Sequence, residues 1–260
     1  MITKQLKIWF NLICRDCTVL KKSMRTRFIN TVCITAANLL VFAYFIPGLD
    51  QSQNYGAFIF FGALAIYGFF DVISFITGML SDVEGDNTLS YNLAIPLHPK
   101  MVFLQIVTYW AICTGLIGVY IFPLGKLFLW NSLSLSEISY IRFIPAFITS
   151  CFVYGTFALW LVSMIKSVSE IQTIWFRVIT PLFMFGAYFF SWKSALATNT
   201  YIACAMLINP LVYTMEAIRS AALGPTNYIP FWISMSVMWA FNFFFFFHGT
   251  HRLKKWLDHP

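Results

Sequence analysis

Two ionisable residues, Asp71 and Arg177, interrupt otherwise apolar stretches of the sequence. A charge in hydrocarbon is costly, so such residues are candidates for lining a transport path or for neutralising one another. We expect Asp71 and Arg177 to pair, or to line a hydrated vestibule. The alternative is that Arg177 lies close to the end of its helix and extends its guanidinium to the interface.

A second charged pair, Glu216 and Arg219, has the three-residue spacing of neighbours on one helix. As a local pair on an exposed helix they would contribute only about 0.2–0.5 kcal/mol. As part of an outer gate they would have to be partly buried. The local pair is the favoured reading.

The remaining chemistry-bearing residues do not form a recognisable site. His248 and His251 have a metal-ligand spacing, and Cys14 and Cys17 form a lone CxxC, but neither pair has the further ligands of a zinc site. No cluster of His, Asp or Ser is present, so we predict neither catalytic residues nor a metal.

The chain also lacks a phosphate-binding loop. The candidate glycines, Gly118 and Gly125, have the wrong spacing before Lys126, and Leu127 stands where Ser or Thr would bind magnesium. We therefore expect a chain that is not an enzyme and binds no cofactor itself.

The composition predicts what holds these residues in place. The 260 residues are 59% hydrophobic and 10% charged, whereas soluble domains carry about 25% charged residues. Spanning a membrane takes about 20 apolar residues. Six stretches are long enough, and they predict an all-α polytopic membrane protein with one transmembrane domain over residues 28–260, its spans being 28–46, 55–80, 101–122, 141–165, 170–190 and 228–247.

The cations predict an orientation. Of the 17 Lys and Arg residues, 12 fall on one side of the predicted spans and four on the other. The positive-inside rule then places both termini in the cytoplasm, including the basic tail 248–260. This distribution also argues against a nucleic-acid partner.

Residues 1–27 precede the first span and predict an amphipathic helix lying at the cytoplasmic interface. Apolar residues recur every three or four positions along it, and cations occupy the other face. Such a helix binds membrane lipid with its apolar side down. Its basic face could also meet the acidic start of the segment between the second and third spans.

That segment, residues 81–100, is too polar to lie in a bilayer. Ser81 and Glu84 have the spacing of a capping box, which predicts a new helix beginning there. The helix is expected to end near Ala94, because Pro96 disfavours a helical conformation at Ile95.

Residues 192–225, just before the last span, are unusually apolar for an outer loop. Asn209 and Pro210 are typical of a helix start, and Gly224 of a helix stop. The segment is too short for two spans, so we predict a re-entrant hairpin entering the membrane from outside.

Taken together, these features resemble the membrane permease subunits of type-2 ABC exporters. The most specific matches are residues 82–96 (DVEGDNTLSYNLAIP) and 209–224 (NPLVYTMEAIRSAALG). The chain departs from the family pattern at Asn87, where Gly is common, and at Ser191 and Trp192, where a Pro often occurs.

The resemblance implies a coupling helix that docks on a separate ABC ATPase, which would hold the ATP and magnesium. The implied coupling residues are Asp82, Glu84, Asp86, Thr88, Leu89, Tyr91, Leu93 and Pro96. The implied outer-gate residues are Asn209, Pro210, Tyr213, Glu216 and Arg219.

The resemblance also implies a homodimer, or a pair with a similar permease, in a bacterial inner membrane. The expected function is export of an amphipathic substrate: a lipid-linked glycan, a polysaccharide or a hydrophobic drug. The alternative is a secondary transporter driven by an ion gradient, which would use intramembrane charges such as Asp71 and Arg177. A membrane-embedded enzyme is a weaker third possibility.

Overall fold

A computed structural model describes residues 2–45, 55–85, 87–129, 135–165 and 167–258. Every regular element within these ranges is a helix. The long helices are α1 (Ile2–Leu39), α2 (Tyr55–Glu84), α4 (Pro99–Phe128), α5 (Tyr140–Val162) and α11 (Phe231–Asp258). The shorter ones are η1 (Leu40–Phe45), α3 (Thr88–Ala94), η3 (Leu135–Glu137), η4 (Val168–Glu170), α6 (Ile171–Ile174), η5 (Trp175–Ile179), α7 (Thr180–Met184), α8 (Trp192–Thr198), α9 (Thr200–Met206) and α10 (Pro210–Ala222).

Four of these helices are long and apolar enough to cross a membrane, namely α2, α4, α5 and residues 231–255 of α11. α9 and α10 would supply a fifth span if they count as one, although they are bent by 94° at their junction. The all-helical, membrane-embedded fold predicted from composition is confirmed. The predicted spans 28–46 and 170–190 are not among the four.

The span expected at 170–190 is divided into η4, α6, η5 and α7. Its π-helical turn, η5, ends just before Thr180 and Pro181. Proline has no N–H to continue the ladder, and its ring clashes with the carbonyl four residues earlier. A π-turn relieves this clash, and the Thr180 hydroxyl donates to the Trp175 carbonyl at 3.0 Å.

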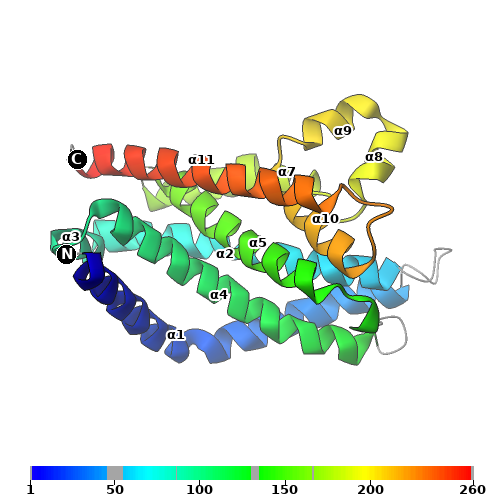
Figure 1. The fold of residues 1–260 in the computed structure, drawn as a ribbon, viewed down its shortest axis with the longest axis horizontal. Coiled ribbons are helices and arrows are strands. Elements are labelled where there is room, and N and C mark those ends of the chain that lie inside the picture. The colour runs from blue at the N-terminus through cyan, green and yellow to red at the C-terminus, as the bar shows by residue number, and fades with distance from the viewer. Residues whose placement is uncertain (1, 46–54, 86, 130–134, 166, 259–260) are drawn as a thin grey trace.

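The span expected at 28–46 is a continuation of the N-terminal helix. α1 runs without a break from Ile2 to Leu39 and passes directly into η1. The interfacial helix and the first apolar stretch are therefore one continuous helix, which is bent between these two parts in Figure 1 and packs against α4.

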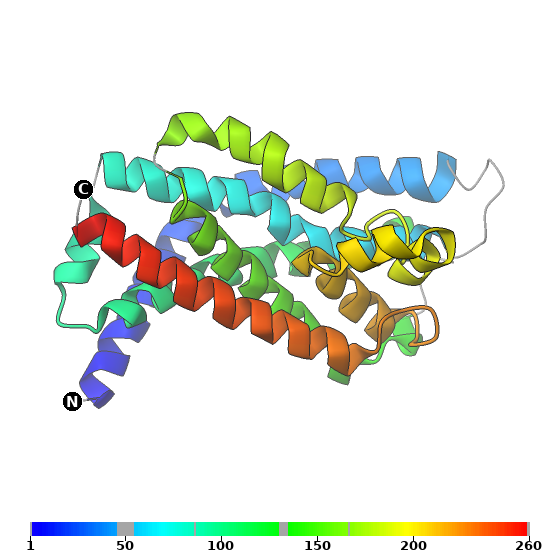
Figure 2. The same cartoon turned by 90° about the horizontal axis from the view of Figure 1, so that it is seen from above.

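α5 lies at the centre of the fold and packs against α2, α4, α10 and α11. Figure 2 shows α2 and α5 between the helical run 168–184 and α11. The Tyr154 hydroxyl of α5 donates to the Ala65 carbonyl of α2 at 2.6 Å and lies 3.0 Å from the Thr214 hydroxyl of α10. Gly68 lets α2 approach this tyrosine, because a Cβ there would overlap the Tyr154 ring.

The first turns of α1, the whole of α3 and the last turns of α11 lie at one end of the molecule (Figure 1). α8 and α9 lie toward the other end. The two segments singled out by the sequence are thus separated by the length of the helical bundle.

Candidate functional site

α3 begins at Thr88, not at Ser81. α2 continues to Glu84, so the backbone of Ser81 belongs to an uninterrupted helix and the predicted capping box does not form. Asp82 supplies the cap instead. Its carboxylate accepts from the backbone N–H groups of Thr88 at 3.1 Å and Leu89 at 2.8 Å.

The reversal between α2 and α3 is made at Asn87. This residue has φ of 53°, in the left-handed region, and its N–H donates to the Asp82 carbonyl at 2.7 Å. Asparagine tolerates this conformation better than other non-glycine residues. Asparagine is therefore a residue type suited to this turn. Asp86 lies outside the described residues.

The predicted coupling residues divide into two groups. Leu89 is buried and Leu93 is half-buried, so both help to seat α3 on the bundle. Thr88 and Tyr91 are exposed, and Tyr91 shows 69% of its surface. The remaining exposed members of the predicted set are Glu84 and Pro96.

α1 braces α3 through a hydrogen bond that the sequence did not indicate. Arg15 Nη1 donates to the buried Asn92 Oδ1 at 3.3 Å, and Arg15 Nε is 2.9 Å from Asp16. Asp16 in turn accepts a hydrogen bond from the Gln105 amide of α4. The contact that the structure shows with the basic face of α1 is therefore made by the side-chain amide of Asn92. The acidic start of the segment 81–100 does not make it, because the Asp82 carboxylate caps α3.

Glu84 connects the same region to the next loop. Its Oε1 accepts from the backbone N–H of Val168, the first residue of η4, at 3.3 Å. The end of α2, the start of η4 and α3 are thus tied together at one end of the bundle.

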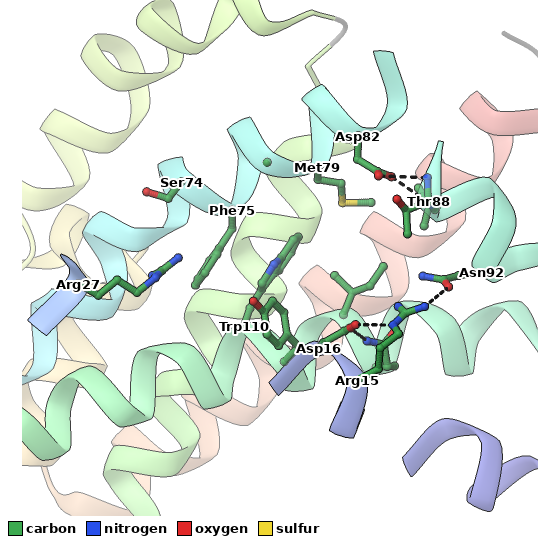
Figure 3. Close-up of a pocket in the computed structure, with 15 residues that line it drawn as sticks. Arg15, Asp16, Arg27, Ser74, Phe75, Met79, Asp82, Thr88, Asn92 and Trp110 are labelled. Atoms are coloured by element: carbon green, nitrogen blue, oxygen red, sulfur yellow. Dashed lines mark hydrogen bonds and ion pairs between the residues drawn. The ribbon is translucent and has the colours of Figure 1, made fainter. Parts of the chain in front are cut away.

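A cavity of about 340 Å³ lies between α1, α2, α3 and α4 (Figure 3). Its lining includes Arg15, Asp16, Arg27, Asp82 and Gln105. The cap and the brace of α3 therefore both lie on the wall of one cavity.

Asp71 pairs with Arg27, not with Arg177. Arg27 Nη1 lies 3.3 Å from Asp71 Oδ2, and both side chains are largely buried. Arg177 lies on the π-turn η5 and is exposed. Asp71 and Arg27 also line a second cavity, of about 760 Å³, whose lining does not include Arg177. Arg27 is the last cation before the first apolar stretch, which is the signal that could have identified it.

No family model, curated protein or solved structure matches this chain.

The start of α10 has the predicted geometry. Asn209 Oδ1 accepts from the Leu211 N–H at 3.0 Å, and Pro210 occupies the first turn. Asn209 also donates to the Leu182 carbonyl at 2.7 Å, which ties α10 to α7. Tyr213 donates to the Leu207 carbonyl at 2.9 Å. Gly224 has φ of 96°, as expected of a helix stop.

Glu216 and Arg219 are fully buried and bond to other segments, so the expected exposed local pair is wrong. The Glu216 carboxylate accepts from the N–H groups of Trp192 and Ile229, both at 2.9 Å. It thereby closes the hairpin at its two ends.

Arg219 donates three hydrogen bonds to backbone carbonyls. Its acceptors are Phe58 at 3.1 Å, Ala187, and Tyr188 at 2.6 Å. Its guanidinium carbon also lies 3.6 Å from the centroid of the Phe58 ring. Nothing in the residue spacing pointed to these partners, which lie on α2 and on the segment after α7.

The remaining candidate residues are the histidine pair near the C-terminus and the two N-terminal cysteines. Trp160 donates to His248 Nδ1 at 2.8 Å. Burial raises the pKa of the Cys17 thiol, and Cys14 and Asp16 add to the effect, which disfavours a reactive thiolate. Among the described residues, no group of three potential ligands could hold a metal ion.

Proposed function

We propose that this chain is the transmembrane permease subunit of an ATP-driven type-2 ABC exporter. The observation that carries the proposal is α3, a short helix outside the long apolar helices. It is capped by Asp82, braced by Arg15 through Asn92, and exposes Tyr91.

The geometry of α3 suits the transfer of force from a partner. A helix whose first N–H groups are capped moves as a unit, whereas a loop would absorb the displacement. α1 and α2 both contact α3 or its cap, so a push on its exposed face would reach two long helices. The ATPase that provides the push would be a separate chain carrying the ATP and magnesium.

The proposed topology has six spans in a bacterial inner membrane, with both termini cytoplasmic. α1 would enter the membrane near Phe28, and the run 168–184 would cross it as a broken helix. α8, α9 and α10 would form the outer re-entrant hairpin. The location of α3 at the same end as the first turns of α1 and the last turns of α11 supports one cytoplasmic face (Figure 1).

The proposed assembly is two permeases, identical or similar, with two ATPase chains. The substrate would be amphipathic: a lipid-linked glycan, a polysaccharide or a hydrophobic drug. The cavity of about 760 Å³ fits that class, since it joins the Arg27–Asp71 ion pair to aromatic rings of Phe70, Trp175 and Phe183.

Cysteine crosslinking tests the coupling role. All six native cysteines are first replaced by serine, and Tyr91→Cys is introduced. Tyr201→Cys is the matched control, since Tyr201 is an exposed tyrosine on α9, with 88% of its surface accessible. We expect Tyr91→Cys to crosslink to the ATPase encoded beside the chain and Tyr201→Cys not to. Absence of any crosslink from Tyr91→Cys, or equal yields from the two positions, would contradict the proposal.

The Arg27–Asp71 ion pair favours a second candidate, a carrier driven by an ion gradient. The two proposals differ in their energy source, which transport into vesicles can separate. An exporter requires ATP hydrolysis by the partner and tolerates collapse of the proton gradient. Transport that persists without nucleotide and stops when the gradient is collapsed would favour the carrier.

A further inference from the structure

The cavity of about 760 Å³ has a polar part to its lining, which lies on one face of α1. The residues of this face recur every three or four positions, and all of them line the cavity: Arg27, Asn30, Thr31, Ile34 and Asn38. The two amides fall inside the first apolar stretch, where a polar side chain is costly unless it faces a partner or a cavity. Their position on the cavity wall is therefore an indication of a ligand.

Both amides are accessible and have no partner. Asn30 is exposed and Asn38 is half-buried. Neither side chain makes a hydrogen bond to any residue that the structure describes. An amide offers two N–H donors and a carbonyl acceptor, so a ligand that both donates and accepts hydrogen bonds would fit this wall.

The charged groups of the same cavity neutralise one another. Arg27 Nη1 lies 3.3 Å from Asp71 Oδ2, and both side chains keep some accessible surface. This contact uses one of the guanidinium's five donors and one carboxylate oxygen. A charged ligand would have to displace one partner of the pair, whereas a hydroxyl group can accept from Arg27 and donate to Asp71 without separating them.

Six aromatic side chains form a continuous group on the rest of the lining. The ring centroids of neighbouring members lie 4.8–6.3 Å apart. The members are Phe42, Phe70, Trp175, Phe183, Tyr188 and Phe189. All but Tyr188 are half-buried rather than buried, so their rings keep surface for an apolar part of a ligand.

We propose that this cavity binds an uncharged amphiphile whose headgroup carries hydroxyl groups, either of a sugar or of a glycerol. The hydroxyl groups bond to the amides of Asn30 and Asn38 and to the Arg27–Asp71 pair, and the hydrocarbon part lies against the aromatic rings. The inference rests on the proposed function in treating this ligand as the exported substrate. It deepens that function by excluding charged substrates.

Native mass spectrometry of the purified full chain tests the selectivity. The detergent is a polyoxyethylene ether, which contains no sugar, and the probes share one monounsaturated hydrocarbon chain. Monooleoylglycerol and oleyl glucoside are neutral and carry hydroxyl groups, oleate is anionic, oleylamine is cationic, and methyl oleate is neutral without a hydroxyl group. We expect each hydroxyl-bearing probe to be retained about tenfold over the other three, which corresponds to about 1.4 kcal/mol.

The same comparison separates the two sources of the headgroup. Stronger retention of oleyl glucoside would support the site and assign it to a sugar, and stronger retention of monooleoylglycerol would support it and assign it to a glycerol. Equal retention of all the probes, or preference for oleate, oleylamine or methyl oleate, would overturn the proposal. This result needs no variant, so it decides the matter even if a variant fails to fold.

Variants assign the selectivity to the cavity. Asp71→Asn leaves Arg27 without its counter-charge, so the retention of oleate should rise to at least that of the neutral probes. Asn38→Leu should lower the retention of both hydroxyl-bearing probes to that of methyl oleate. Asn11→Leu is the matched control, because Asn11 is an exposed amide of the same helix outside the cavity. Equal loss in Asn11→Leu, or an unchanged charge preference in Asp71→Asn, would overturn the assignment.

The binding measurement uses no ATPase, so its outcome is independent of the crosslinking at Tyr91. Crosslinking to the ATPase without selective retention would overturn this inference and leave the exporter proposal standing. Selective retention without crosslinking would support the binding site and contradict the exporter.

Discussion

α3 and α10 both begin with a side-chain cap, yet the fold holds them in opposite ways. All thirteen residues of α10 are buried, and its Glu216 and Arg219 bond to the backbones of distant segments. α3 has seven residues, of which only Leu89 and Asn92 are buried.

The contrast indicates different roles for the two ends of the molecule. A buried charge fully bonded to fixed carbonyls costs several kcal/mol to disturb, so α10 is immobilised. α3 is held at its start by Asp82 and at its side by Arg15, and its other face remains open to a partner. Under the proposed function, α10 would serve as a fixed support and α3 as the helix that the partner moves.

The largest effect is expected from Arg219→Met. The substitution leaves the carbonyls of Phe58, Ala187 and Tyr188 without donors and Glu216 without a nearby cation, so we expect a loss of about 3–5 kcal/mol. Thermal unfolding of the detergent-solubilised protein measures it. Arg177→Met, at an exposed arginine, should change stability by less than about 0.5 kcal/mol. Equal shifts in the two variants would remove the contrast between buried and exposed charge.

Glu216→Gln should have the next largest effect. The amide can accept only one of the two N–H groups that the carboxylate now accepts, so the loss should be about 1.5–3 kcal/mol. We expect faster proteolysis at the ends of the hairpin, near Trp192 and Ile229, measured by limited digestion. An unchanged digestion pattern would show that Glu216 does not close the hairpin.

Gly62→Ala and Gly78→Ala compare the packing of α2 toward its two ends. A Cβ at Gly62 would overlap the Arg219 guanidinium, whereas a Cβ at Gly78 meets nothing within 4 Å. We expect Gly62→Ala to destabilise the protein by about 1–3 kcal/mol. Gly78→Ala should be neutral or stabilising by up to about 1 kcal/mol. Chemical unfolding checks both, and the opposite order would contradict the packing described for Arg219.

Asp82→Ala should have the smallest effect on overall stability. It removes the cap of α3, which is worth about 0.5–2 kcal/mol locally. Hydrogen exchange at the amides of Thr88 and Leu89 should accelerate, while the unfolding temperature of the whole protein changes little. Ser81→Ala is the control, since Ser81 is exposed within α2 and should leave this exchange unchanged. Faster hydrogen exchange at these amides in Ser81→Ala as well would support the predicted capping box at Ser81.

The sequence by itself determined the features that depend on composition or on a few neighbouring residues. The excess of apolar residues established a helical membrane protein. Asn209 with Pro210 marked the start of α10, and Gly224 its stop, because caps and left-handed turns involve atoms close together along the chain.

Only the tertiary structure decided which groups meet across the fold. Asp71 pairs with Arg27, which lies 44 residues away in the sequence, and Arg219 donates to the carbonyl of Phe58, which lies 161 residues away. The start of α3 also depended on the fold around it. Because α2 continues through Ser81, no helix begins there and the predicted capping box cannot form. Asp82 caps α3 instead. Side-chain spacing gives the groups that can bond, but the packing of distant helices selects their partners.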